Sequence, residues 1–249
     1  MPLDVRQFAC LTDNYGFLVR DLASGRTAVV DTPDAKAVLD ALDAAGWGLD
    51  LILNTHWHPD HAGGNAAVQA ATGARIIGPE EVRRIAPLDE VVSDGDWVAL
   101  GETRLRVIGC GGHTLGHVAY HAPEANLAFV GDTLFAMGCG RLFEGEPAQM
   151  WTSLQRLAAL PDETRLYCAH EYTAANARFA LSLDRDPAVS ARAETIFEAR
   201  RRGEATVPTT VALERATNPF LRAPLLAPDA AGPVEAFAQV RAAKDAFKG

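Results

Sequence analysis

Short apolar runs alternate with turn signals over the first two thirds of the chain. Runs rich in Val, Ile, Leu and Phe, bounded by Gly, Asp, Asn or Ser, are typical of β-strands. They predict strands at Val5–Cys10, Gly16–Arg20, Thr27–Asp31, Leu51–Leu53, Arg75–Ile77, Trp97–Leu100, Leu105–Ile108, Val118–His121, Leu127–Val130 and Arg165–Ala169. Between these runs, helical spacing of apolar residues predicts helices at Asp34–Ala45, Asn65–Thr72 and Ala148–Leu160. Such alternation is typical of an α/β domain.

The pattern changes at about Thr173. Beyond this residue the apolar positions keep a helical period, and we expect helices at Thr173–Leu183, Ala188–Arg202 and Val234–Phe247. Only Ala205–Val207 is typical of a strand in this part. We therefore expect an α/β domain over residues 1–173 and a small all-helical domain over residues 174–249.

The composition is that of a globular protein with an excess of acidic residues. Of its 249 residues, 48% are hydrophobic and 22% are charged, and the formal net charge is −9. An acidic chain is unsuited to nucleic acid, and no apolar stretch has the length of a membrane span. Because the first residues lack the regions of a signal peptide, we expect a cytoplasmic protein with no membrane or nucleic-acid partner. Its cysteines, Cys10, Cys110, Cys139 and Cys168, are expected to stay reduced.

The segment Thr55–His61 concentrates side chains of the kind that bind metals. It reads THWHPDH, and it contains three of the chain's seven histidines and one aspartate. It follows the expected buried strand Leu51–Leu53, and open α/β sheets place their sites at such strand ends. Imidazole and carboxylate are ligands of zinc, iron and manganese. A His-rich surface loop is the alternative, and the residues downstream argue against it.

Three further residues of ligand type follow apolar strands, namely His113, Asp132 and His170. The complete set is sufficient for two adjacent metals. It comprises His56, His58, Asp60, His61, His113, Asp132 and His170. Asp132 is the expected bridge, because a carboxylate offers two oxygens whereas an imidazole offers one metal-facing nitrogen.

The polar residues near this set receive simpler interpretations. We expect His117 to orient a ligand or to satisfy the backbone. His121 is expected at the surface, because it ends a predicted strand beside Pro123. Glu171 is expected to support a ligand or to face solvent rather than to bind metal.

Eight motifs together resemble one family. They are LTDNY (residues 11–15), THWHPDHAGGN (55–65), HTLGH (113–117), GDTLF (131–135), GCGRLFEG (138–145), YCAHEYT (167–173), TVPTT (206–210) and NPF (218–220). The HxHxDH pattern resembles that of the metallo-β-lactamase superfamily. The remaining motifs narrow the resemblance to the hydroxyacylglutathione hydrolases, also called glyoxalase II. This resemblance runs nearly end to end.

The resemblance implies a four-layer αββα sandwich followed by a small C-terminal helical domain that binds substrate. It also implies two divalent metal ions, which we expect to be zinc, with iron or manganese as alternatives. The first metal would be held by His56, His58 and His113. The second would be held by Asp60, His61 and His170, with Asp132 as the bridge between them.

The activity that the resemblance implies is thioester hydrolysis. An S-(2-hydroxyacyl)glutathione, such as S-D-lactoylglutathione, would be cleaved by a metal-bound hydroxide to a 2-hydroxy acid (D-lactate) and glutathione. This reaction is the second step of methylglyoxal detoxification. Asp60 and Asp132 would be the catalytic carboxylates, and we expect Asp60 also to orient the hydroxide. A thiol with a pKa of about 8.5 leaves readily, so no strong general acid is required.

The resemblance further implies a set of residues that contact the glutathione portion of the substrate. The set comprises Arg141, Phe143, His170, Tyr172, Arg241 and Lys244. Arg241 and Lys244 are three positions apart on one expected helix and therefore share a face. Because the whole chain is acidic, local cations are needed to hold the two carboxylates of glutathione.

Three departures from the family pattern involve five positions. Gly111 and Gly112 stand where proline is common, so we expect a looser loop before the third ligand segment. Ala169 replaces the usual glycine before the last ligand histidine. Arg141 and Phe143 stand where some relatives have lysine and tyrosine, which keeps a charge and removes one hydroxyl.

Three alternative functions remain. One is a persulfide dioxygenase with a single iron, and another is a β-lactamase or other hydrolase of the same fold. The third is a non-catalytic module that binds metal or glutathione. The seven-residue ligand set and the long helical tail favour the thioesterase over all three. We expect the enzyme to be a monomer.

Overall fold

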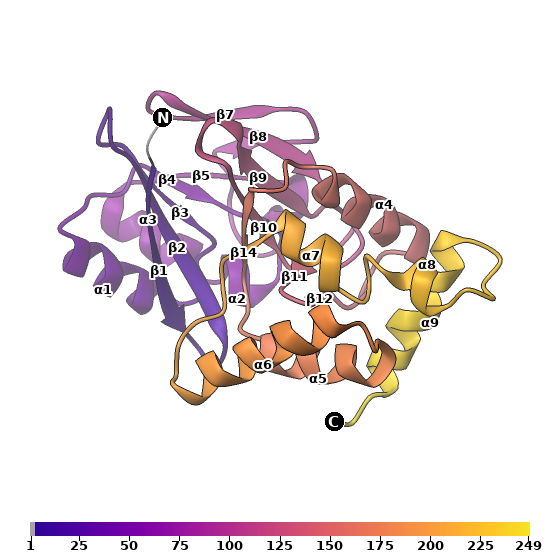
Figure 1. The fold of residues 1–249 in the computed structure, drawn as a ribbon. Helices are drawn as coiled ribbons and strands as arrows, with labels where there is room; N and C mark the ends of the chain where they lie inside the picture. The colour runs from indigo at the N-terminus through magenta and orange to yellow at the C-terminus, as the bar shows by residue number, and fades with distance from the viewer. Residues whose placement is uncertain (1–2) are drawn as a thin grey trace. The chain divides into compact units, whose positions relative to one another are not determined.

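The computed structural model describes residues 3–249, which divide into two compact units (Figure 1). Unit 1 runs to Gly109 and resumes over Gly116–Gly131. Unit 2 comprises Cys110–Leu115 and Asp132–Gly249. The expected ligands are therefore distributed over both units, with the THWHPDH segment in unit 1 and His113, Asp132 and His170 in unit 2.

Unit 1 contains a mixed six-stranded sheet in the order β1-β2-β3-β4-β5-β6. The strands are Leu3–Cys10, Asn14–Asp21, Thr27–Val30, Leu51–Leu53, Arg75–Gly78 and Glu90–Val91. Strands β1 to β3 are antiparallel and strands β3 to β6 are parallel. Helices α1 (Ala35–Ala45) and α3 (Asn65–Thr72) connect parallel strands and cover one face (Figure 1). Val38 and Val68 of these helices pack against Ile52 in the sheet.

A second set of strands in unit 1 lies against the other face of this sheet. The strands β7 (Trp97–Leu100), β8 (Thr103–Gly109), β9 (Val118–Ala122) and β10 (Leu127–Gly131) are antiparallel. The ring centroids of Phe17 and Phe129 lie 5.5 Å apart across the interface. The hydroxyl of Tyr120 donates a hydrogen bond of 2.8 Å to the carbonyl of Asn54, at the end of β4. The short helices of this unit are α2 (Pro59–Ala62), η1 (Glu80–Arg84) and η2 (Pro123–Ala125).

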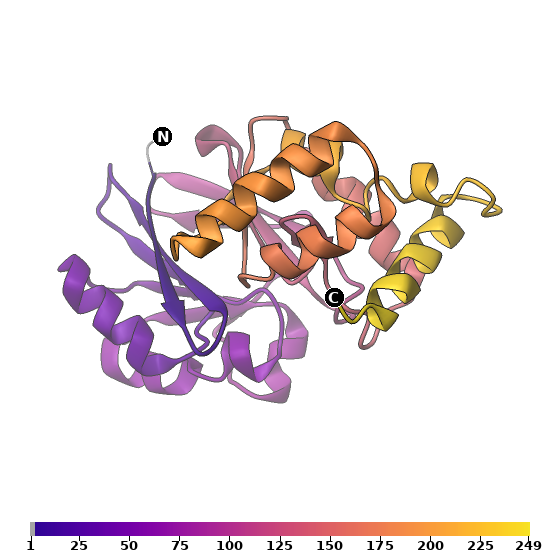
Figure 2. The same ribbon diagram turned by 60° about the horizontal axis from the view of Figure 1, so that its bottom comes forward.

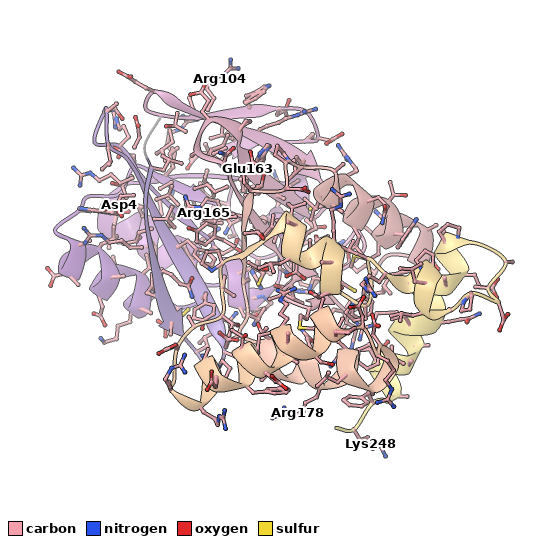
Figure 3. The ribbon with its side chains drawn as sticks, in the orientation of Figure 1. Asp4, Arg104, Glu163, Arg165, Arg178 and Lys248 are labelled. Carbon is pink, nitrogen blue, oxygen red and sulfur yellow. The ribbon has the colours of Figure 1, made fainter. Side chains whose placement is uncertain are left out.

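Unit 2 is mainly helical. Its helices are α4 (Pro147–Ala158), α5 (Thr173–Leu183), α6 (Pro187–Arg201), α7 (Val211–Thr217), α8 (Ala223–Leu226) and α9 (Pro233–Ala246). Two strand pairs accompany them, β11 with β12 (Leu134–Phe135 and Gly138–Cys139) and β13 with β14 (Arg165–Cys168 and Thr209–Thr210). Helices α5 and α6 form a helical hairpin (Figure 2), whose core includes Ala177, Val189 and Met137 of the β11–β12 turn. Arg178 projects outward from α5 (Figure 3).

The hydrophobic pattern predicts most of these elements to within two residues of their observed ends. The strand expected at Ala205–Val207 is wrong, because β14 begins only at Thr209, after Pro208. Proline lacks the N–H that a strand ladder uses, so the pairing starts beyond it. Helices α7 and α8 were not predicted, since they are too short to show a clear helical period.

His121 is buried, so its expected position at the surface is wrong. Its side chain is 7% exposed, and it lies opposite Arg106 and Ala128 in neighbouring strands. Burial, and then the charge of Arg106, lower the pKa of this imidazole because both disfavour its charged form. The following Pro123 suggests a strand end, but β9 is flanked by strands on both sides and is buried along its length.

The cysteines are free and buried, as expected for reduced thiols. Burial raises the pKa of Cys10 and Cys168 to about 12 and that of Cys139 to about 11. These thiols are therefore neutral near pH 7, and they offer neither a nucleophile nor a thiolate ligand. Over residues 3–249, no helix is both long enough and apolar enough to cross a membrane.

Replacing Tyr120 with phenylalanine tests the link between the two sheets of unit 1. Tyr120→Phe leaves the carbonyl of Asn54 buried without this donor, so we expect the free energy of unfolding to fall by about 1–2 kcal/mol. Denaturant titration of both proteins measures the difference. An unchanged midpoint and slope would show that this hydrogen bond contributes nothing to stability.

Candidate metal centre

The loop after β4 carries four expected ligands in unit 1. The Asn54 side chain donates to the carbonyl of His61 at 3.2 Å, which ties the beginning of the loop to its end. His58 precedes the first residue of α2 as its N-cap. His56 and His61 are fully buried, and His58 and Asp60 are partly buried. The loop therefore directs its imidazoles inward rather than into solvent.

Asp31 determines which nitrogen of the His61 imidazole carries a proton. The carboxylate is 3% exposed, and it accepts hydrogen bonds of 2.8 Å from the N–H and the hydroxyl of Thr55. Its Oδ2 also lies 2.8 Å from Nδ1 of His61. Because an ionised carboxylate can only accept, Nδ1 is the donor. The lone pair on Nε2 of His61 then points toward Oδ2 of Asp60, which is 3.6 Å away.

The same carboxylate orients His56 through Thr55. The single hydroxyl proton of Thr55 goes to Asp31, so the hydroxyl oxygen accepts from Nδ1 of His56 at 3.1 Å. Nε2 of His56 consequently presents its lone pair to Nδ1 of His58, 3.0 Å away. His117, which we expected to orient a ligand, stacks on the His56 ring with centroids 4.7 Å apart. These contacts leave little freedom for the His56 ring.

Asp60 is held by Asn14 of β2. The amide nitrogen Nδ2 of Asn14 lies 3.1 Å from Oδ2 of Asp60 and 3.2 Å from its backbone carbonyl. Asn14 is 4% exposed, so it is a fixed donor. Its two hydrogen bonds set both the carboxylate and the backbone of Asp60.

Asp132 lies between two imidazoles in unit 2. Its Oδ2 is 3.4 Å from Nε2 of His113, and its Oδ1 is 3.4 Å from Nε2 of His170. Nδ1 of His113 lies 2.8 Å from the carbonyl of Arg141, which can only accept, so this nitrogen is the donor. In neutral His113 the lone pair on Nε2 therefore faces a carboxylate oxygen. Such a pair of acceptors is stable only when a proton or a cation lies between them.

Aromatic side chains fix the orientation of His170. The ring of Tyr172 stacks on the imidazole at 4.6 Å with an interplanar angle of 4°. Phe135 presents its edge to both rings, with centroids 5.9 Å from His170 and 5.4 Å from Tyr172. The three rings form one packed group in unit 2.

The glycines that precede His113 lie in a closely packed loop, and the expected looseness of that loop stays a prediction. Gly112 has φ +143°, which residues with a side chain rarely adopt, and a Cβ there would lie 2.8 Å from Cα of Met150. The hydroxyl of Ser153 donates to the carbonyl of Gly111 at 2.6 Å. Glycine at these positions permits close packing against α4.

Arg241, an expected glutathione contact, has a guanidinium group that already serves the fold. The side chain is 7% exposed, and it donates to the carbonyl of Cys139 at 3.1 Å and to Oδ1 of Asp245 at 2.8 Å. Arg141 reaches the same Asp245 oxygen at 3.6 Å from its Nε. Arg241 thus links α9 to the end of β12 through a buried hydrogen bond.

Lys244 and the aromatic residues are placed differently. Lys244 is half-buried and donates to the carbonyl of Ala175 at 3.2 Å. Burial, and then the charge of Arg241, lower the pKa of its ammonium group. Phe143 is 61% exposed and directs its edge at His113, with centroids 5.2 Å apart, while Tyr172 is 38% exposed. These exposed rings beside two imidazoles offer an aromatic surface to a ligand.

The donor set fits divalent cations. His56, His61 and His113 each use one ring nitrogen as a donor to a fixed acceptor and turn the other toward a second ligand-type atom. Hydrogen bonds of this kind fix the tautomer and ring orientation of metal-binding histidines. Within unit 1, the ligand atoms of His56 and His58, and those of Asp60 and His61, lie within 4.8 Å of one another. Imidazole nitrogen and carboxylate oxygen suit zinc, iron and manganese.

Asp31 and Asn14 were not predicted as parts of this site. Asp31 follows β3 with φ +58°, a conformation that aspartate tolerates better than most residues. A carboxylate directly after a buried strand is the signal that could have identified it. Glu171 is not directed at a ligand, because it accepts from the N–H and the hydroxyl of Thr206 at 2.9 and 2.6 Å.

Comparison with known proteins identifies the relatives of this chain. Residues 14–170 match the Metallo-beta-lactamase superfamily, and residues 171–247 match the Hydroxyacylglutathione hydrolase C-terminus. Hydroxyacylglutathione hydrolase from Erythrobacter litoralis is 56% identical over 98% of this chain and 100% of its own length. The protein of the same name from Maricaulis maris is 55% identical over 98% of both chains.

Solved structures share the fold. The crystal structure of ETHE1 from Myxococcus xanthus has a TM-score of 0.70 at 24% identity and covers 96% of this chain and 90% of its own. TTHA1623, in a di-iron-bound form, has a TM-score of 0.63 at 25% identity and covers 88% of this chain and 100% of its own. The fold is thus that of the metallo-β-lactamases, with a helical C-terminal region. Within that superfamily the chain belongs to the hydroxyacylglutathione hydrolase family.

Replacing Asp31 with asparagine tests its control over the imidazoles. In Asp31→Asn an NH₂ group replaces one carboxylate oxygen, and an amide nitrogen cannot accept a hydrogen bond. The side chain can then no longer accept from all three donors of Thr55 and His61. We therefore expect Zn²⁺ affinity to fall about 10–100-fold. Competition with a chromophoric chelator measures this affinity.

Asp21→Asn is the matched control. Asp21 is a similarly buried carboxylate of unit 1, which accepts hydrogen bonds from Ala23, Ser24, Glu102 and Thr103. The control is expected to lose stability and to keep its metal affinity. Equal loss of affinity in both variants would contradict a specific role for Asp31.

Proposed function

We propose that this chain hydrolyses S-(2-hydroxyacyl)glutathione, such as S-D-lactoylglutathione, to a 2-hydroxy acid and glutathione. Relatives named hydroxyacylglutathione hydrolase, at 48–56% identity over nearly the full chain, support this function. The observation that carries it is the C-terminal match over residues 171–247, because a superfamily match alone would leave the substrate open. The persulfide dioxygenase, the β-lactamase and the non-catalytic module are not favoured.

The chain is a metal-dependent hydrolase, and we propose two divalent metals, zinc in the first instance with iron or manganese as alternatives. His56, His58 and His113 would hold one metal, and Asp60, His61 and His170 the other. Asp132 would bridge them, since each of its oxygens faces a different imidazole. The di-iron form of TTHA1623, at 25% identity, supports a two-metal site in a protein of this fold.

The residues of the chain prepare the site for attack on a thioester. When bound, divalent metals supply Lewis acidity, which lowers the pKa of water and polarises a carbonyl oxygen. Asp31 and Thr55 hold the imidazoles in the tautomer that can bind a metal, and Asn14 holds Asp60. We propose that Asp60 also orients the attacking water. A thiolate leaves without a proton, so these residues need supply no general acid.

We propose that unit 2 binds the glutathione portion. Arg141 and Lys244 would neutralise its carboxylates, against the −9 charge of the whole chain. Tyr172 and Phe143 would pack along the peptide, and His170 would lie at its reacting end. Arg241 would act mainly through the backbone of Cys139 and through Asp245, which it already binds. In this arrangement residues 1–173 form the catalytic domain and residues 174–249 the substrate-binding domain.

We further propose that the enzyme is a cytoplasmic monomer. The buried, neutral thiols suit a reducing compartment. Size-exclusion chromatography with light scattering measures the mass in solution directly.

The purified chain is expected to release thiol from S-D-lactoylglutathione. Thiol release is followed with a chromogenic disulfide, with the metal-free protein as the control. Removal of metal should abolish the activity, and addition of Zn²⁺, Fe²⁺ or Mn²⁺ should restore it. A fully metal-loaded chain without thiol release would refute the proposed reaction.

Replacing Lys244 with alanine tests the charge contact with glutathione. One charge contact from this half-buried lysine is worth about 1 kcal/mol, so we expect the KM of Lys244→Ala to rise about fivefold. The contact lies at the remote end of the substrate and is the same before and during reaction, so kcat should change little.

Because the pKa of Lys244 is lowered, the KM of the wild type should begin to rise at a lower pH than the KM of Lys244→Arg.

S-lactoyl-N-acetylcysteamine, a thioester that lacks the glutathione carboxylates, is the control substrate. Its cleavage by Lys244→Ala should match that by the wild type. Loss of both activities in the same proportion would assign Lys244 to the fold rather than to the substrate.

A further inference from the structure

The turn of the β11–β12 hairpin is bonded to the side chain of Glu214 in α7 and to that of Asn218, the C-cap residue of this helix. The N–H of Met137 donates to Oε2 of Glu214 at 2.9 Å. The amide of Asn218 donates to the carbonyls of Phe135 at 3.2 Å and of Gly138 at 2.9 Å. The same amide lies 2.8 Å from Oε2 of Glu214. Backbone groups on both sides of the turn are thus satisfied by two side chains, one from α7 and one from its C-cap residue.

The surroundings of Glu214 require a carboxylate side chain at this position. Glu214 is fully buried, and it is surrounded by donors from the hairpin, from Asn218, from the hydroxyl of Thr209 and from the guanidinium of Arg192. Only an ionised carboxylate supplies two oxygens that both accept. Arg192, on α6, provides the compensating charge. A buried carboxylate with this many donors is firmly oriented.

The hairpin turn is also packed into the α5–α6 pair. Met137 is fully buried in the cluster that contains Ala177 of α5 and Val189 of α6. It has φ +55°, which is costly for a residue with a side chain and persists where surrounding contacts enforce it. The amide of Asn176 donates to the carbonyl of Ala136 at 3.1 Å. Three helices therefore fix the turn.

The hairpin connects these contacts at its turn to the expected ligands of unit 2. Asp132 lies two residues before the first residue of β11, and Phe135 of β11 contacts the rings of His170 and Tyr172. At the end of β12, the carbonyl of Cys139 accepts from Arg241. A displacement of the turn would consequently move three groups: the expected ligand Asp132, the Phe135 ring that packs against His170, and the Cys139 carbonyl that binds Arg241.

We propose that Glu214 and Asn218 are positioning residues, which act through the β11–β12 hairpin to set Asp132 and His170 for metal binding. The proposal rests on the proposed function only for the role of the bound metal, which is thioester hydrolysis. Neither residue touches the expected ligands, so each acts through the hairpin backbone and Phe135.

Two variants test this role by Zn²⁺ affinity, measured by competition with a chromophoric chelator. Glu214→Gln places an amide donor among donors and leaves Arg192 without its counter-charge. Asn218→Ala removes the bonds to Phe135 and Gly138 and keeps the charge pair intact, so it remains informative where Glu214→Gln folds poorly. We expect both to bind Zn²⁺ about tenfold or more weakly at a temperature where they are folded.

Asp184→Asn is the matched control, because Asp184 is a buried carboxylate of unit 2 whose side chain accepts from Arg222 at 2.8 Å and from the N–H of Asp186 at 3.0 Å rather than from the hairpin. It should lower the melting temperature and leave Zn²⁺ affinity within about twofold of the wild type. Zn²⁺ affinities of Glu214→Gln and Asn218→Ala equal to that of Asp184→Asn would overturn the proposal.

Thioester hydrolysis separates this proposal from the proposed function. In a thioesterase, Glu214→Gln and Asn218→Ala should lower kcat and raise KM together, because the hairpin reaches both Asp132 and Arg241. A wild type that binds Zn²⁺ but cleaves no thioester would refute the proposed function. The comparison of Zn²⁺ affinities would still decide whether Glu214 and Asn218 position the expected ligands.

Discussion

The candidate site depends first on the buried carboxylate of Asp31. It accepts two hydrogen bonds from Thr55 and one from His61, and through Thr55 it also determines the proton on His56. One ionised group thereby turns the lone pairs of two imidazoles toward the interior of the loop. Since the carboxylate can only accept, this orientation holds before any metal binds.

Unit 2 achieves the same result by a different route. There the backbone carbonyl of Arg141 fixes the tautomer of His113, and aromatic packing fixes the ring of His170. Asp132 lies between the two imidazoles with one oxygen for each. The expected ligands are oriented by a few further residues, namely Asn14, Asp31 and Thr55 in unit 1 and Phe135, Arg141 and Tyr172 in unit 2.

The ligand-type residues can be proposed from the sequence, because they follow apolar strands that end in a small or polar residue, and their role as metal ligands stays a prediction. The sequence also predicts the strands and long helices, whose periods are clear. Asp31 and Asn14 were missed, although Asp31 directly follows a buried strand and Asn14 lies in the LTDNY motif, because neither position shows in the sequence which ligand residue it contacts. His121 was misplaced, because burial on both faces of a strand depends on tertiary neighbours. Glu214 and Asn218 lie about eighty residues from the hairpin that they bind, a distance that no local pattern spans.

The most direct test of this account is the tautomeric state of the histidines in the metal-free protein. Long-range ¹H–¹⁵N correlation spectra at neutral pH distinguish a proton on Nδ1 from one on Nε2. The account predicts that His56, His61 and His113 each carry their proton on Nδ1, toward Thr55, Asp31 and the Arg141 carbonyl. Protonation of these rings on Nε2 alone would contradict it, because the lone pairs would then face away from the proposed metals.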